Sequence, residues 1–241
     1  SLPARSEVCI RDSLEAGRLM RVLAIDTATT DLVTGVVDTE TGAVTERILT
    51  DTRAHNEQLI PTVEELLQTT SLTYTDLDAI VVGCGPGPFT GLRVGMATAS
   101  ALGDALSIPV HGVCTHDAIA ASAAAQGRTL VATDARRKEI YWATYEDGQR
   151  VEGPDVVKPA EIQVAVDSVI IPDNLVAKLP EELQNLPHTA ANPRPAGLVA
   201  VANLDAAPEP LTPLYLRRPD AVPPKPKPRS AALPDVAGLN L

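Results

Sequence analysis

One polar motif of this 241-residue chain has residue types that suit nucleotide binding. It is Asp26-Thr27-Ala28-Thr29, and it directly follows the apolar run 22–25, which is typical of a buried strand. A carboxylate and hydroxyls at such a strand end suit the phosphates and Mg²⁺ of a nucleotide. An aspartate there also commonly caps a turn. Asp26, Thr27 and Thr29 are therefore a candidate nucleotide site, with a turn-capping role as the alternative.

A second candidate is the glycine-rich stretch 83–95, which follows the apolar run 79–82. A turn between a buried strand and a helix often binds phosphate through the first amides of the helix. However, no Gly-Lys-Ser/Thr follows, and Pro88 stands where the dinucleotide fingerprint requires a small residue. The same glycines are equally suited to a close approach of two backbones.

The helix predicted over residues 92–106 carries small residues at a spacing of four, which places them on one face: Gly91, Gly95, Ala99 and Gly103. Each glycine inside a helix costs up to about 1 kcal/mol relative to alanine. Such a stripe is useful where another backbone comes very close. The neighbour is either the chain's own sheet or helix, or another subunit that docks on a flat helix face.

Other chemically versatile residues give weaker signals. His55 lacks the second histidine of a helical zinc pair. His111 and His116 are five apart and fit ordinary polar positions, and neither a Gly-x-Ser-x-Gly elbow nor a Cys-His arrangement is recognisable. The charged loop 134–139 is either a solvated turn or a contact in which Arg136 or Arg137 pairs with a carboxylate.

Hydrophobic periodicity predicts the elements that position these residues. We expect strands over 22–25, 32–37, 43–50 and 79–82, and then over 108–113, 129–133, 139–145 and 168–171. We expect helices over 55–69, 92–106, 117–125, 159–166 and 196–204, with Pro61 starting or kinking the first. This order predicts an α/β protein of two lobes, each with a mixed sheet.

The composition excludes several classes of function. The formal net charge of −11 disfavours strong nucleic-acid binding by the whole surface, and an aromatic content of 2 % argues against base stacking as a main activity. Three cysteines without metal-ligand spacing (Cys9, Cys84 and Cys114) fit a reducing cytoplasm. No membrane span or secretory signal is recognisable. Residues 1–19 are predicted to be a disordered extension, with a translation start at Met20 as the alternative, and 219–241 a Pro/Lys-rich tail.

Four segments together resemble the TsaB family: 22–29, 53–61, 85–95 and 134–141. The most specific is Gly85-Pro86-Gly87-Pro88-Phe89-Thr90-Gly91-Leu92-Arg93. The resemblance runs from about Met20 to Arg218. It implies an actin-like ATPase fold with an N-terminal lobe over 20–114 and a C-terminal lobe over 115–218.

The same resemblance implies a function in threonylcarbamoylation of the adenosine beside the anticodon in tRNAs that read codons beginning with A. Family members are catalytically silent paralogues of TsaD. They dimerise with TsaD through helices of the N-terminal lobe, TsaE joins the pair, and the partner makes the main tRNA contacts. The expected interface residues here are the stripe Gly91, Gly95, Ala99 and Gly103, together with Arg93 and His55.

One feature of the sequence agrees with the expected lack of catalytic activity. Related TsaD enzymes carry a His-x-x-x-His metal motif where this chain has Thr115-His116-Asp117-Ala118-Ile119. We therefore expect no catalytic residue, no metal and no tightly bound cofactor, with ATP or ADP held weakly or only through the complex. We also expect a cytoplasmic protein that can form a homodimer when alone. The rival hypothesis is an actin-like small-molecule kinase or hydrolase that uses Asp26 and the glycine turn on ATP-Mg²⁺.

Overall fold

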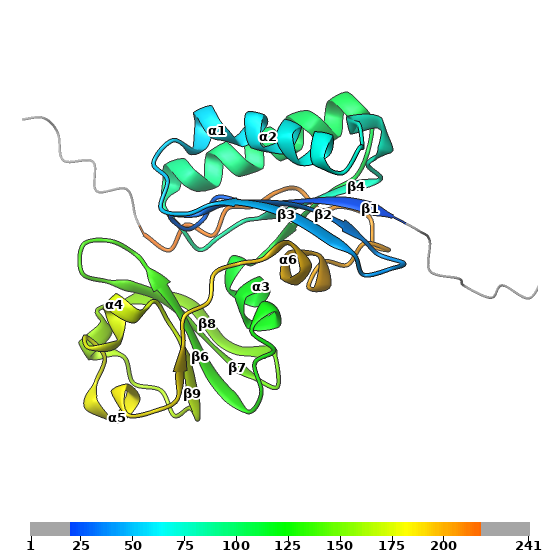
Figure 1. Ribbon diagram of the computed structural model, residues 1–241. Coiled ribbons are helices and arrows are strands. Elements are labelled where there is room, and N and C mark those ends of the chain that lie inside the picture. Colours follow the sequence, from blue (N-terminus) through cyan, green and yellow to red (C-terminus); the bar gives the residue numbers. More distant parts are fainter. Residues whose placement is uncertain (1–19, 218–241) are drawn as a thin grey trace, which may run out of the picture.

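A computed structural model describes residues 20–217, which form two five-stranded sheets with helices on their faces (Figure 1). The first sheet has the strand order β3-β2-β1-β4-β5. The strands are β1 (Arg21–Asp26), β2 (Leu32–Asp38), β3 (Val44–Leu49), β4 (Ala79–Gly83) and β5 (Val110–Val113). β1, β2 and β3 form an antiparallel meander, while β4 and β5 run parallel to β1. The sheet is therefore mixed, as predicted.

The apolar run of β1 is buried on both faces because successive side chains point to opposite sides of a strand. Leu23 and Ile25 pack beneath α1 (His55–Thr69) and α2 (Phe89–Leu106). Val22 and Ala24 pack on the other face, against α3 (Thr115–Ser122) and α6 (Pro195–Ala200). Figure 1 shows α1 and α2 on one side of this sheet and α6 on the other.

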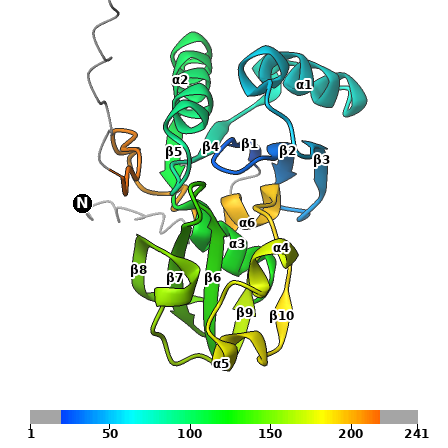
Figure 2. The same cartoon turned by 90° about the vertical axis from the view of Figure 1, so that its left-hand side faces the viewer.

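The second sheet has the order β10-β9-β6-β7-β8 and is also mixed. Its strands are β6 (Arg128–Asp134), β7 (Ile140–Glu146), β8 (Gln149–Val157), β9 (Ser168–Ile170) and β10 (His188–Thr189). The short helices α4 (Asp173–Val176) and α5 (Glu181–Gln184) cover one face, and α3 packs on the other (Figure 2). The remaining elements are two 3₁₀ turns, η1 (Tyr74–Asp76) and η2 (Pro159–Glu161).

Some predicted details differ from the structure. Pro61 does not start its helix, because α1 begins at His55 and continues past the proline; the alternative, that Pro61 kinks the helix, stays a prediction. The predicted helix 159–166 is only the turn η2, and the long edge strand β8 was not predicted. The residues of β8 are mostly exposed and include Gly153-Pro154, so they lack the buried alternation that indicates a strand.

The chain returns to the first sheet after β10. Asn192 donates a hydrogen bond to Asp31 at 2.7 Å, and Arg194 pairs with Glu46 at 2.7 Å, before α6 packs on the sheet. The closing segment, residues 211–217, places Leu211 against the first core and lies beside β5 (Figure 2, orange). The first sheet is thus covered by two separate stretches of the chain, whereas the strands of the second sheet come from the continuous stretch 128–189. The lobe boundaries at 114 and 218 stay predictions.

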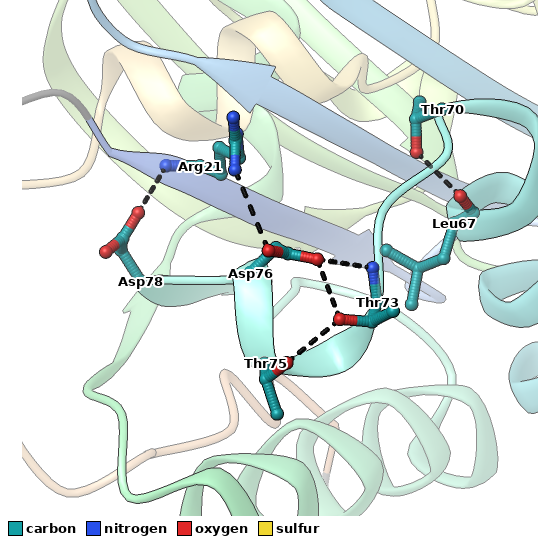
Figure 3. A network of polar contacts seen from close by, with 7 residues as sticks. All are labelled: Arg21, Leu67, Thr70, Thr73, Thr75, Asp76 and Asp78. Carbon is teal, nitrogen blue, oxygen red and sulfur yellow. Dashed lines mark hydrogen bonds and ion pairs between the residues drawn. The ribbon is translucent and has the colours of Figure 1, made fainter.

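A polar cluster fixes the start of β1 to the turn that precedes β4 (Figure 3). Asp78 accepts a hydrogen bond from the Arg21 amide at 2.9 Å, and the Arg21 guanidinium lies 3.9 Å from Asp76. Asp76 also accepts from the amide and hydroxyl of Thr73, both at 2.7 Å. This cluster lies at the opposite end of β1 from Asp26, so it aligns the strand without contributing to the candidate site.

The predicted extension 1–19, the predicted tail 219–241 and Cys9 lie outside the described residues. Within residues 20–217, no helix is both long and apolar enough to cross a bilayer.

Candidate functional site

Asp26 ends β1 with its carboxyl group fully buried. Thr115, the first residue of α3, donates a hydrogen bond to Asp26 Oδ2 at 2.7 Å, and the Ala28 amide donates to Oδ1 at 2.8 Å. A side chain at Gly83 would collide with the same carboxyl group. The carboxyl group thus joins the end of β1 to α3 and is closed off from solvent.

Burial raises the pKa of Asp26 to about 6, although the hydrogen bonds from Ala28 and Thr115 oppose this shift. The cause is the loss of hydration of the charged form, which exceeds the gain from two donors. A carboxylate that coordinates Mg²⁺ has to be ionised and accessible. With a pKa of about 6 the Asp26 carboxyl group is largely ionised near pH 7, but it is fully buried and so is not accessible to a metal ion in this conformation.

The other two residues of the predicted nucleotide site differ in their surroundings. Thr27 is buried, and its hydroxyl donates to the carbonyl oxygen of Gly91 at 2.8 Å. Thr29 lies on the turn, where its hydroxyl accepts a hydrogen bond from the Asp31 amide at 3.2 Å. Only Thr29 therefore has a side chain near open space, and the predicted trio does not form a joint ligand set.

The glycine-rich stretch makes a close backbone contact with the turn that contains Asp26. A Cβ atom at any of four glycines would strike Asp26, Thr27 or Ala28, and these are Gly83, Gly87, Gly91 and Gly95. Of the two interpretations left open by the sequence, the structure supports close approach. The glycines let α2 and β4 pack directly on the end of β1.

The predicted interface stripe on α2 faces inward, and this part of the interface prediction is wrong. Gly95, Ala99 and Gly103 are buried, and Gly91 is partly buried. Gly95 faces the Thr27 hydroxyl, while Gly103 faces the Val110 side chain of β5. In this fold the stripe, called the inner stripe below, is covered by the chain's own sheet, so no other subunit can pack on it.

A second four-spaced row runs along the opposite face of α2 and is exposed: Arg93, Ala97, Ala101 and Ala105. We call it the outer stripe. α1 lies beside α2 on the same side of the sheet (Figure 2), and its own outward face carries exposed residues: Glu57, Ile60, Glu64, Glu65 and Gln68. Arg93 is thus the one predicted interface residue of α2 that lies on its open face.

His55 lies at the N-terminus of α1 and borders a cavity of about 730 Å³ between the two sheets. Its Nε2 atom is buried and has no hydrogen-bond partner among the described residues. We call this space the inter-sheet cavity. It is lined by polar groups from both lobes, including Thr29, Thr30, Arg53, Asn56, Thr90, Asp134, Arg136 and Asn192.

His116 is fully buried next to Thr115, with Nε2 2.9 Å from the hydroxyl of Thr133 on β6. Burial, assisted by Arg150, lowers its pKa to about 3, so the ring is neutral near pH 7. Asp117 accepts a hydrogen bond from Tyr145 at 2.8 Å and pairs with Arg150 at 3.4 Å. Over residues 20–217, no three His, Cys, Asp or Glu side chains are grouped so that they could hold a metal ion.

A smaller cavity of about 500 Å³ lies between the glycine-rich turn, the loop after β6 and the closing segment. We call it the aromatic pocket. Its ring-bearing residues are Phe89, Tyr141 and Tyr215, and its cationic residues are Arg136, Arg137 and Arg217. Arg217 pairs with Glu139 and donates to the carbonyl oxygen of Arg136 at 3.2 Å. The charged loop therefore does join an arginine to a carboxylate, but that arginine comes from the closing segment.

Phe89 and Tyr215 were not predicted as site residues. Their rings lie 4.9 Å apart, and the Arg93 guanidinium lies 3.8 Å above the Phe89 ring. Arg93 also donates to the Tyr215 hydroxyl at 3.3 Å. The one sequence feature that could have pointed to them is composition. The chain has only one Phe, one Trp and four Tyr, so each aromatic residue was worth considering as a site residue.

Comparison with known proteins gives a consistent set of relatives. The family model described as TsaD, tRNA N6-adenosine threonylcarbamoyltransferase, matches residues 44–201. An uncharacterized protein of Mycobacterium tuberculosis is 51 % identical over 210 residues, which cover 86 % of this chain and 96 % of that protein. The tRNA threonylcarbamoyladenosine biosynthesis protein TsaB of Escherichia coli is 38 % identical over 130 residues, covering 53 % of this chain and 55 % of that protein.

Among solved structures, YeaZ from Pseudomonas aeruginosa superimposes with a TM-score of 0.66 at 26 % identity, covering 76 % of this chain and 90 % of that chain. This similarity, together with the two mixed sheets flanked by helices, confirms the predicted actin-like fold.

Proposed function

Because this chain belongs to the TsaB family, we propose that it is a subunit of the machinery that makes threonylcarbamoyladenosine in tRNA. In this proposal it supports a TsaD partner and does not itself transfer the threonylcarbamoyl group. The TsaB names of the matching relatives support the process, and the geometry at the end of β1 supports the division of labour.

The observation that carries the proposal is the position of the Asp26 carboxyl group. In an actin-like enzyme that uses ATP-Mg²⁺, an acid at this strand end would have to reach the cleft. Here Thr115 and the Ala28 amide hold it inside the protein, and Gly83 leaves the space that it fills. We infer that ATP or ADP binds weakly at most, in the inter-sheet cavity or through the assembled complex.

The partner-binding face that we propose is the outer stripe of α2 together with the outward face of α1. Small side chains at Ala97, Ala101 and Ala105 allow another helix to approach closely. Arg93 at one end and the α1 carboxylates beside the stripe supply charges that would orient the partner. TsaD is the proposed partner on this face, and TsaE is proposed to join the pair. Two copies of this chain would use the same face in the absence of TsaD.

Reconstitution tests the proposed function. The assay combines TsaD and TsaE with TsaC, the enzyme that makes the threonylcarbamoyl adenylate, and adds ATP, threonine, bicarbonate and unmodified tRNA. It is run with and without this chain, and threonylcarbamoyladenosine is measured by mass spectrometry. We expect modification only when the chain is present. Full modification without it would overturn the proposal.

A variant tests the proposed face separately. Ala101→Glu puts a charge in the centre of the outer stripe and should abolish co-purification with TsaD without changing the thermal midpoint of the free chain. Ala121→Glu is a matched control, because Ala121 is also an exposed helical alanine but lies on α3. Retained TsaD binding by Ala101→Glu would remove this stripe from the interface.

A further inference from the structure

The aromatic pocket brings aromatic rings and arginine side chains together. Three of the six aromatic residues line it, although aromatics make up only 2 % of the chain. Phe89 and Tyr215 remain 48 % and 39 % exposed despite their mutual contact. Exposed apolar groups that lie together, as these two rings do, often mark a site that binds another molecule.

The positive charge around the pocket contrasts with the whole chain. Arg136, Arg137 and Arg217 line it, and Arg93 lies over the ring of Phe89, on a protein whose formal net charge is −11. Arg217 is neutralised by Glu139. Over residues 20–217, the Arg136 guanidinium has no carboxylate within ion-pair distance, although it borders the pocket. The local field therefore attracts an anion.

The loop that presents these cations is held in a costly conformation. Arg136, Arg137 and Lys138 have φ values of +60°, +50° and +66°, which are left-handed. Each such residue costs about 1–2 kcal/mol when it is not glycine. Hydrogen bonds from Ala135 to Glu139 at 3.0 Å and from Glu139 to Arg136 at 3.0 Å close the loop. The loop thus presents consecutive cationic side chains at the rim of a cavity walled by rings.

We propose that the aromatic pocket binds an unpaired nucleotide of an RNA strand, with its base against Phe89 and Tyr215 and its phosphate near Arg136. A cavity of about 500 Å³ is within the usual range for small ligands. Proteins bind single-stranded RNA by combining aromatic platforms for bases with cations that follow the backbone. This inference rests on the proposed function, because it makes the chain contribute a direct contact to the RNA substrate.

RNA fits this pocket better than an acidic protein segment does. An acidic segment would pair with the arginines but would gain little from the flat, exposed rings. A nucleotide can pair its phosphate with an arginine and stack its base on a ring. Arg93 covers one face of the Phe89 ring, 3.8 Å from its centroid, so a base that contacts Phe89 and Tyr215 can also lie against the planar guanidinium. The acidic remainder of the surface would confine RNA to this one region.

Fluorescence anisotropy with the full chain tests the proposal. The probe is a labelled single-stranded RNA of about eight nucleotides, a length typical of single-strand sites. The matching duplex, AMP and poly-glutamate serve as competitors. We expect the single strand to bind at low salt and each competitor to displace it at least about tenfold less effectively than unlabelled single strand, because the pocket needs both base and backbone.

Four variants locate the contact. Phe89→Leu and Tyr215→Leu each remove a ring and should weaken binding about tenfold or more, as expected for the loss of one stacked base. Arg136→Gln should weaken binding and reduce the slope of log K against log salt by about 0.7, as expected for one phosphate contact. Arg128→Gln removes an exposed charge at the start of β6, outside the pocket, and should change the dissociation constant by less than about twofold.

A fifth variant separates the two cavities, because Arg136 and Phe89 border both. Arg53→Gln alters only the inter-sheet cavity, while Tyr215→Leu alters only the aromatic pocket. An Arg53→Gln effect as large as that of Tyr215→Leu would overturn the assignment. If AMP displaces the probe at the same concentrations as unlabelled RNA, free nucleotide is the ligand. If poly-glutamate does so, the site recognises only negative charge. Either outcome overturns the proposal, and so does duplex binding as tight as that of the single strand.

The outcome is separable from that of the proposed function. If reconstituted modification requires the chain but single-stranded RNA does not bind the pocket, only this inference fails. If RNA binds as expected but modification proceeds without the chain, the proposed function fails.

Discussion

The two faces of α2 carry similar rows of small residues with opposite surroundings. The inner stripe has glycines at three of its four positions, and a Cβ atom at any of them would collide with Thr27, directly after β1, or with Val110 of β5. The outer stripe has alanines at three positions, all exposed. Glycine in a helix costs about 1 kcal/mol relative to alanine. The difference indicates that glycine marks a close contact already made within the fold, whereas exposed alanine leaves room for a contact still to be made.

The largest expected effect is from filling the inner stripe. Gly95→Leu forces a side chain into the Thr27 hydroxyl and disrupts its hydrogen bond to Gly91. Overpacking of this kind costs about 3 kcal/mol, which for a chain of this size lowers the thermal midpoint by roughly 6–12 °C. Thermal unfolding followed by circular dichroism measures it.

Ala97→Leu is the matched change on the outer stripe and should alter stability by less than about 0.5 kcal/mol. If the two variants unfold at the same temperature, the inner and outer assignments of the two faces are wrong.

The second effect concerns Asp26, beneath the inner stripe. Its folded-state pKa of about 6 lies above the ordinary value of 3.8, so the folded protein holds this proton more tightly than the unfolded chain does. The resulting stabilisation is complete below about pH 4 and is lost as the pH rises through 6. Asp26→Asn cannot ionise, keeps an oxygen that accepts from the Ala28 amide, and places an NH2 group that can donate to the Thr115 hydroxyl where that hydroxyl now donates. It should therefore be more stable than the wild type at pH 8, on the order of 2 kcal/mol.

The difference between Asp26→Asn and the wild type should shrink between pH 6 and pH 4, and urea unfolding at several pH values measures it. An Asp26→Asn variant that is less stable than the wild type at pH 8 would show that the carboxyl group is not held as the buried, neutral-favouring group described above.

The smallest effect concerns the closing segment beside the outer stripe. Arg217→Gln removes a half-buried ion pair with Glu139. The exposed fraction is 24 % for the Arg217 side chain and 32 % for that of Glu139. Partly exposed pairs contribute about 0.5–1 kcal/mol, so the thermal midpoint should fall by roughly 1–4 °C. Arg47→Gln, which breaks a more exposed pair with Glu65, should change it less. A larger loss from Arg47→Gln would contradict the contribution assigned to the closing segment.

Local patterns predicted most of the secondary structure. The continuous apolar runs of β1 and β4 indicated strands covered on both faces, and the helical spacing of Leu59, Val63 and Leu66 indicated α1. β8 was missed because an exposed edge strand with a Gly-Pro pair has no buried face to impose alternation. A helix was predicted over 159–166, but only the turn 159–161 forms. A few apolar residues at helical spacing favour a helix without ensuring one.

The candidate site was predicted only in part. The motifs around Asp26 and Gly91 were identified, but their mutual contact was not, because residues so far apart in sequence meet only through the parallel pairing of β1 with β4. The aromatic pocket was missed entirely. Phe89 and Tyr215 are separated by most of the chain and come together only because the closing segment returns to α2.

The sequence by itself determined the order of strands and helices, the small-residue character of α2 and the resemblance to the TsaB family. These properties are local, since hydrophobic periodicity and backbone preferences act over a few residues. The tertiary structure alone decided which face of α2 is covered, because four-spaced residues define a stripe but not its neighbour. It also decided that Asp26 is enclosed, because burial depends on Gly83 and Thr115, which the fold brings to the carboxyl group from two other elements.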